Sequence, residues 1–226
     1  DFLNFLQSFV AELEKSTETK YRTAQKYKTL YNKLKSFRPW GITFDSINEE
    51  FWKDYKDWRY KNTNTKSQNT LNKDMGCLKF VLRKAHKKGL HTNTIYQDCD
   101  FSTKIVKTSI FALNEDEVNK LYLFDFSNNP RLERVRDWFI ISCWTALRWS
   151  DFSTLKPEHI MKDGDDYYLI KDTIKTDTQV FIPLENEGYS LLAKYHFKGI
   201  PISNQKFNDY LKEVFEVAGI TDTIVL

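Results

Sequence analysis

Apolar residues recur at helical spacing from the very start of the chain. In residues 1–15 they return every three to four positions, which predicts an amphipathic helix. Ser16 and Thr17 offer an N-cap for a second helix, which we expect to end near Phe37, because the position before Pro39 disfavours helical backbone. The inner face of this second helix is predicted to hold Ala24, Tyr27, Tyr31 and Leu34.

Two more helices are expected within the first hundred residues. One begins near Asn48 after a short extended piece. The other runs from about Ser67 to Lys87, and Gly89 suits the position that ends it. This region shows no alternation typical of strands, so residues 1–100 are predicted to form a bundle of about four helices.

The pattern changes after this bundle. Residues 101–112 are polar and irregular, and we interpret them as a linker to a second domain, residues 113–226. Asn114 is expected to cap a helix with an acidic first turn, which suits the helix dipole. An apolar helix is predicted from Pro130 to about Trp144.

The segment DDYYLIKDTIKTDTQVFIPL carries β-branched and aromatic clusters around polar turns. It predicts strands near 166–171 and 179–183, joined by a turn that contains Lys175, with room for a third short strand. Helices over about 185–196 and 204–218 complete the pattern. The predicted fold class is therefore mainly α in two domains, a helical bundle followed by an α+β domain with a small antiparallel sheet.

Charge is distributed unevenly between the two predicted domains. Residues 1–112 hold 21 Lys and Arg against 12 Asp and Glu, a net charge of +9, whereas residues 113–226 hold 13 against 19, a net charge of −6. Such asymmetry favours a polyanion as the partner of the first domain. The alternative is a basic surface that only faces solvent.

Cysteine usage and hydropathy narrow the class of protein. Cys77, Cys99 and Cys143 are an odd, scattered set with neither the spacing of metal ligands nor that of a disulfide framework, which is typical of the reducing cytoplasm. No apolar run approaches the roughly 18 residues of a membrane-spanning helix. We therefore expect a cytoplasmic protein without a membrane partner.

Two cationic residues are candidates for chemistry. Arg148 follows the apolar helix, where a cation is costly unless a negative group meets it. Asp151, three residues on, could supply a structural ion pair on one helix face, and a ligand is the other possibility. Lys175 lies in a predicted hairpin turn, where most lysines have no function beyond solubility.

The two stretches that hold these cations resemble motifs of the tyrosine recombinases, the phage-integrase family. TALRWSDFSTLKPEHI (145–160) is similar to the first catalytic motif, although Ala146 stands where the family usually has glycine. IKTDTQVFIPL (174–184) is similar to the lysine hairpin of the second motif. The basic N-terminal half resembles the helical, SAM-like core-binding domain, and PISNQKFNDYLKEVFEVAGI resembles the helix before the third motif.

The resemblance implies a site-specific DNA recombinase that forms a 3′-phosphotyrosine intermediate. Arg148 is then expected to pair with the non-bridging oxygens of the scissile phosphate, where charge develops. Lys175 is expected to protonate the leaving 5′ oxygen as a general acid. Asp151 is expected to support Arg148 and the adjacent backbone. The resemblance implies no metal, no other cofactor and no small-molecule substrate.

The third motif of the family, His-x-x-Arg followed by a nucleophilic tyrosine, is not found after the hairpin. Tyr189, Tyr195 and Tyr210 lie too early in the chain for the nucleophile. We therefore expect an incomplete catalytic domain that binds DNA but does not cut it, either as part of a full integrase or as a degenerate, non-catalytic accessory protein or repressor.

Double-stranded DNA is the expected partner, held between the two domains, with a homotetramer working on two duplexes. Polar and basic positions of the first domain and the linker are the candidate DNA contacts, since such side chains bind phosphates and base edges. These are Lys20, Arg22, Lys26, Lys28, Lys66, Ser67, Gln68, Asn69, Lys73, Lys104 and Lys107.

Overall fold

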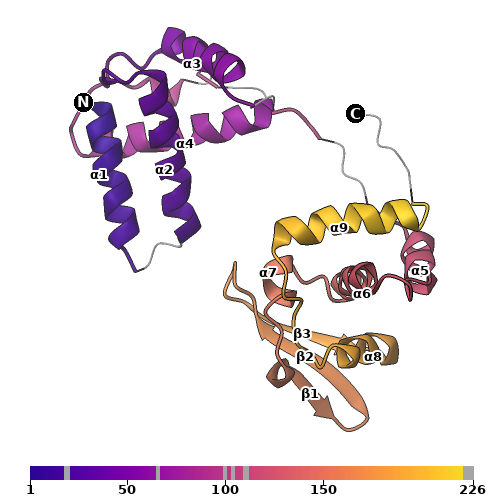
Figure 1. Cartoon of the computed structure of the whole chain (residues 1–226). Helices are drawn as coiled ribbons and strands as arrows, with labels where there is room; N and C mark the ends of the chain where they lie inside the picture. Colours follow the sequence, from indigo (N-terminus) through magenta and orange to yellow (C-terminus); the bar gives the residue numbers. More distant parts are fainter. Residues whose placement is uncertain (18–20, 65–66, 99–100, 103–104, 109–111, 221–226) are drawn as a thin grey trace. The chain divides into compact units, whose positions relative to one another are not determined.

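The computed structural model describes residues 1–17, 21–64, 67–98, 101–102, 105–108 and 112–220. The chain divides into two compact units, Asp1–Thr108 and Ser109–Leu226 (Figure 1). The first unit is helical, and the second combines helices with one small antiparallel sheet. The predicted fold class is confirmed.

Within its described residues, the first unit has four α-helices and one 3-10 helix. Asp1 caps the first of them by accepting a hydrogen bond from the Asn4 amide, and Asn48 caps the third by accepting one from Phe51. Antiparallel α1 and α2 lie side by side (Figure 1). The elements are α1 (Phe2–Lys15), α2 (Tyr21–Phe37), α3 (Glu49–Asn62), α4 (Gln68–Lys87) and η1 (Ile95–Gln97).

The C-terminal end of α4 is closed as the sequence predicts. Gly89 has a left-handed φ of +71°, which glycine adopts without steric cost. Its amide donates to the carbonyl of His86, and the Leu90 amide donates to that of Ala85. These two bonds satisfy carbonyl groups that the end of a helix leaves without partners.

The inner face of α2 differs from the prediction at one position. Leu30 is 2% exposed and lies in the core with Ala24, Tyr27 and Leu34, whereas Tyr31 is only partly buried and bonds to Gln7 through its hydroxyl. The stripe that faces the core passes through 27, 30 and 34, because residues three and four apart share a helix face.

Ser16 and Thr17, the expected N-cap of α2, are both described, whereas residues 18–20 are not, and α2 is described from Tyr21 onward. Ser16 instead ends α1, with its amide bonded to the carbonyl of Glu12.

The second unit places its helices around a three-stranded sheet of order β1-β2-β3, antiparallel throughout. The short third strand, Ile160–Asp163, lies just before the segment in which the sequence left room for one. The elements are α5 (Glu115–Leu123), α6 (Pro130–Thr145), α7 (Trp149–Phe152), η2 (Pro157–His159), β1 (Ile160–Asp163), β2 (Asp166–Asp172), β3 (Gln179–Leu184), α8 (Asn186–Lys194) and α9 (Asn204–Val217).

Helix α6 is the centre of this unit. Its residues Trp138, Ile140 and Ile141 are at most 1% exposed and belong to one core with Leu169 of β2 and Val214 of α9. Helix α6 contacts α5, α8 and α9, and it lies between α9 and the sheet (Figure 1), so the Arg148 segment begins at the end of a packed helix.

Candidate active site and nucleic-acid interface

A sharp turn carries the chain from the end of α6 to Arg148. Ala146 adopts the left-handed conformation, with φ 53° and ψ 17°. The Thr145 hydroxyl donates to the carbonyl of Ile141 at 2.7 Å and accepts from the Leu147 amide at 3.4 Å. Glycine is favoured at such a φ, which gives a physical reason for the glycine of the family motif.

This turn brings the Arg148 side chain to the surface. Arg148 is exposed, and within the described ranges no hydrogen bond or ion pair engages its guanidinium. The structural ion pair with Asp151, which the sequence left open, is not formed. Arg148 occupies the N-cap position of α7. The Arg148 cation is therefore available to an anionic ligand.

Asp151 serves the hairpin instead. It is 0% exposed, and its Oδ1 accepts the backbone N–H of Ile174 at 2.9 Å. In the described part of the chain Oδ2 has no hydrogen-bond partner. An ionised carboxylate forms strong hydrogen bonds with backbone amides. Asp151 thereby fastens the backbone next to Lys175 to the segment that carries Arg148.

Lys175 lies where the sequence predicts it, in the turn between β2 and β3. Its side chain is exposed, whereas Thr173 at the base of the turn is 6% exposed. Thr173 is not among the site residues expected from the sequence. The signal that could have singled it out is the series of three threonines at 173, 176 and 178, since their hydroxyl groups bond readily to turn backbone.

A cavity of about 420 Å³ joins the Arg148 turn to the hairpin. Arg148, Asp151, Thr173 and Phe181 are among its lining residues, whereas Lys175 is not. The structure thus brings two of the three predicted catalytic residues to one cavity.

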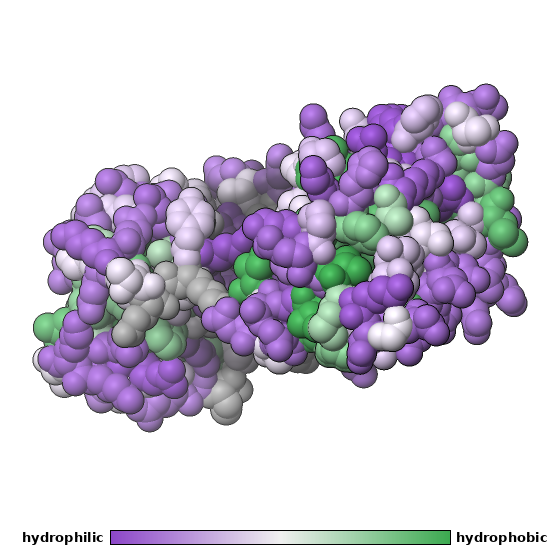
Figure 2. Space-filling model, turned by 90° about the horizontal axis from the view of Figure 1, so that it is seen from below, coloured by the Kyte–Doolittle hydropathy of each residue, from purple (hydrophilic) through white to green (hydrophobic). Residues whose placement is uncertain are grey.

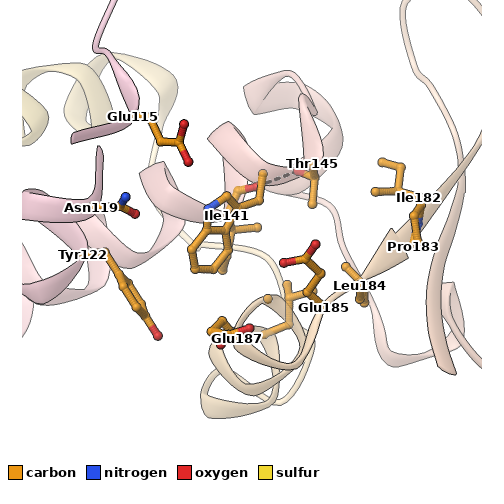
Figure 3. A pocket seen from close by; sticks show the side chains of 13 residues that line it. Glu115, Asn119, Tyr122, Ile141, Thr145, Ile182, Pro183, Leu184, Glu185 and Glu187 are labelled. Atoms are coloured by element: carbon orange, nitrogen blue, oxygen red, sulfur yellow. Dashed lines mark hydrogen bonds between the residues drawn. The ribbon is translucent and has the colours of Figure 1, made fainter. Parts of the chain in front are cut away.

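A larger cavity of about 630 Å³ adjoins the first and shares Thr145 with it (Figure 3). Glu115, Glu185 and Glu187 lie around its apolar floor (Figure 3). The three carboxylates would repel a phosphate. The larger cavity is therefore a poor phosphate site despite its volume. The smaller cavity beside Arg148 is the better candidate.

The three tyrosines that follow the hairpin, Tyr189, Tyr195 and Tyr210, are each held by local contacts. The Tyr195 hydroxyl donates to buried Asp137 at 2.6 Å, and burial followed by this bond raises the pKa of Tyr195 well above its ordinary value. The ring of Tyr189 stacks on Tyr167 at 3.8 Å. Arg131 lies over the Tyr210 ring at 4.2 Å. Each ring has a packing role.

His159, which precedes the hairpin, has a local role. Its Nδ1 accepts the backbone N–H of Lys156 at 3.0 Å. Burial, and next the charge of Lys171, lowers the pKa of His159, so the neutral ring is favoured.

The described candidate DNA contacts of the first unit fall into three groups. Arg22, Lys26, Ser67, Lys73 and Lys107 are exposed, and Gln68 is half-buried. Lys28 is exposed but forms an ion pair with Glu14 at 2.8 Å. Hydrophilic side chains cover most of the face of this unit seen in Figure 2. Lys20, Lys66 and Lys104 lie outside the described residues.

Asn69 forms the third group alone. Its amide nitrogen donates to the Val106 carbonyl at 2.8 Å, and its oxygen accepts the Val106 amide at 3.0 Å. This pair of bonds fixes the segment that bears Lys107 beside the start of α4. Because the Asn69 amide already holds Val106, its first role is to position Lys107.

Within the described ranges, no group of three His, Cys, Asp or Glu side chains is arranged to hold a metal ion. None of the described helices is long and apolar enough to cross a membrane. Cys77 is buried and Cys143 is exposed, and both are free thiols.

Residues 1–105 match the family model of the phage integrase SAM-like domain. No curated protein matches the chain by sequence. Among solved structures, a lambda integrase tetramer bound to a Holliday junction is similar over 96% of this chain and 64% of that chain, with a TM-score of 0.71 and 17% identity. This chain therefore spans less than two thirds of that relative.

Two other structures share the fold. The Tn1549 transposon integrase (residues 82–397), in complex with circular intermediate DNA, matches over 98% of this chain and 80% of its own, with a TM-score of 0.67 and 13% identity. The XerH site-specific recombinase bound to difH substrate matches over 95% and 70%, with a TM-score of 0.56 and 16% identity. The chain therefore carries a phage integrase SAM-like domain in residues 1–105, and along its length it has the fold of these integrase and recombinase structures.

Proposed function

We propose that this chain is the DNA-binding and phosphate-activating part of a site-specific DNA recombinase of a phage or mobile element. The observation that carries the proposal is the exposed Arg148, whose guanidinium has no protein partner in the described ranges and lines a cavity with Asp151. A cation held at a rigid turn without a partner is suited to an anion from outside the protein.

Arg148 would bind the non-bridging oxygens of a scissile phosphodiester. A guanidinium matches two such oxygens in a planar fork, and its charge lies where negative charge increases in the transition state. Because the helix end and the left-handed Ala146 fix the direction in which Arg148 leaves the core, little reorganisation is needed when the phosphate arrives.

Lys175 would act as the general acid. An ammonium group at the tip of a hairpin can approach the leaving 5′ oxygen and transfer a proton to it. The carboxylate of Asp151 supports this role through the Ile174 amide, one residue before the lysine. The tyrosine that attacks the phosphate would lie outside these 226 residues.

The first unit would bind duplex DNA mainly through phosphates. Its charge of +9 includes exposed cations on α2, on α4 and in the segment after η1. The lambda integrase, Tn1549 integrase and XerH structures all contain DNA or a DNA junction, and two lambda integrase structures are a dimer and a tetramer. By analogy we propose a homotetramer on two duplexes in the cytoplasm.

The second candidate function is a non-catalytic DNA-binding protein, an accessory factor or repressor derived from an integrase. This candidate does not require a His-x-x-Arg, which is not found after the hairpin within these 226 residues. Both candidates bind DNA, and they differ in whether a covalent protein–DNA intermediate forms.

A denaturing gel distinguishes the two. The 226-residue chain and the product of the whole reading frame are each incubated with DNA from the ends of the element. We expect the 226-residue chain to bind DNA without a covalent adduct, and the whole product to form an adduct that Arg148→Ala abolishes. A reading frame that stops at Leu226, with binding and no adduct, would establish the accessory protein. An adduct formed by the 226-residue chain would contradict the proposed position of the nucleophile.

A further inference from the structure

The turn that carries Lys175 is closed by one buried hydroxyl group. The Thr173 Oγ1 donates to the Thr178 carbonyl at 3.0 Å, lies 2.8 Å from the Thr176 hydroxyl, and accepts the Thr178 amide at 3.3 Å. The Thr173 backbone adds two bonds, with its amide on the Thr178 carbonyl and its carbonyl on the Asp177 amide. Thr173 therefore contacts every one of the three residues that return the chain to β3.

The backbone of this loop is held in a conformation it would not keep unaided. Asp177 has a left-handed φ of 53°, which aspartate tolerates better than most residues but which still costs free energy. Such a conformation persists where the surroundings over-determine it. The bond from the Asp177 amide to the Thr173 carbonyl and the three contacts of the hydroxyl supply that restraint.

The same threonine faces the candidate phosphate cavity. Thr173 lines the cavity together with Arg148 and Asp151. Asp151 holds the next residue, Ile174, by its amide. The hydrogen bonds of Thr173 and Ile174 hold the two residues directly before Lys175. Because Thr173 and Asp151 both line the cavity, the backbone that leads to Lys175 is anchored at the cavity wall.

We infer that Thr173 is a positioning residue that locks the Lys175 turn and sets the reach of the lysine toward a phosphate bound at Arg148. The reach toward DNA rests on the proposed function, whereas the lock concerns the free protein alone. A mobile turn would spread the ammonium over many positions, and catalytic groups lose efficiency when they are misplaced by about 1 Å.

The test compares Thr173→Val with Thr173→Ser in the 226-residue chain. Valine keeps the shape of threonine and lacks the hydroxyl, whereas serine keeps the hydroxyl. Amide hydrogen exchange without DNA is the first measurement. Because the hydrogen bond from the Thr178 amide to the Thr173 hydroxyl is lost, this amide should exchange roughly tenfold faster in Thr173→Val. Thr173→Ser should stay close to the parent, and Thr43→Val, the same change in the other unit, should leave the turn unchanged.

The second measurement reports on the lysine. The lysines are reductively methylated with ¹³C, and the Lys175 signal is assigned by its loss in Lys175→Arg. In the parent and in Thr173→Ser, duplex DNA should shift this signal. In Thr173→Val the signal should sharpen and its shift should shrink at least twofold, while the affinity for DNA changes less than twofold.

The outcomes separate the lock from the proposed function. Parent-like exchange of the Thr178 amide in Thr173→Val overturns the lock, as does equal loss of protection in Thr173→Ser. If Thr176→Val, at an exposed position, gives a smaller acceleration of the same amide, the lock is supported even if the valine at 173 lowers overall stability. If the exchange changes as expected but DNA does not shift Lys175 in the parent, the lock stands and the proposed role of Lys175 fails.

Discussion

Ala146 shows how one residue sets the direction of the catalytic segment. Its left-handed backbone ends α6 and turns the chain toward Arg148, at a steric cost of roughly 1 kcal/mol for a residue with a Cβ atom. We expect Ala146→Gly to raise the free energy of unfolding by about 0.5–1 kcal/mol, measured by urea denaturation. Ala193→Gly inside α8 is the matched control and should lower it by a similar amount. A loss of stability in Ala146→Gly would contradict the assignment of strain to this position.

Arg148 is expected to matter for DNA cleavage and not for the stability of the fold. Because the guanidinium contacts no partner in the described ranges, Arg148→Ala should change the free energy of unfolding by less than about 0.5 kcal/mol. In the product of the whole reading frame, the same substitution should slow DNA cleavage by about 10²-fold or more, as loss of one transition-state contact typically does. A stability loss above about 1 kcal/mol would favour a structural role.

Elements differ in how much of them the sequence predicts. The helices are predicted well, because caps such as Asn48 and Asn114 and the 3.6-residue period act within one segment. A third strand was an open possibility, but the sequence did not place it at Ile160–Asp163, since three of these four residues are exposed and carry little periodic signal. The Arg148–Asp151 pair was wrong as a structural alternative, because Asp151 bonds to Ile174, 23 residues away, and spacing along one helix does not reveal such a contact.

The connection between α8 and α9 contacts a segment far from it in the sequence, and this contact should contribute to stability. The Gly199 amide donates to the Leu155 carbonyl at 3.0 Å, and a Cβ atom at 199 would lie 2.2 Å from the carbonyl oxygen of Ser153. This contact packs the connection against the segment that follows α7.

We expect Gly199→Ala to lower the free energy of unfolding by about 3 kcal/mol or more, because backbone rather than a flexible side chain must move. Thermal unfolding monitored by circular dichroism measures this. Gly76→Ala is the control, since that position lies inside α4 with no atom within 4 Å of the added Cβ, and it should gain about 1 kcal/mol. Equal effects of the two substitutions would contradict the close approach at Gly199.

At the scale of the whole molecule, charge divides as the fold does. The unit Asp1–Thr108 carries the net charge of +9 and the second unit that of −6, because residues 109–112 are uncharged. The sequence alone predicts this division of charge, since charged residues can be counted without a structure. It does not predict that Lys28 is paired with Glu14 or that Asn69 holds Val106, because both depend on how distant segments pack.

The affinity for duplex DNA should therefore fall steeply with salt, and the slope should depend on the first unit. Each neutralised phosphate contributes about −0.9 to the slope of log K against log salt concentration, so Lys73→Gln should reduce the slope by about 1. Fluorescence anisotropy of a labelled duplex between 50 and 200 mM salt measures it, a range over which about 6–10 contacts change affinity 10³–10⁵-fold. Lys212→Gln in α9 makes the same charge change on an exposed side chain of the acidic unit and should leave the slope unchanged. A flat salt dependence, or equal effects of both substitutions, would mean that the basic face of the first unit does not bind phosphates.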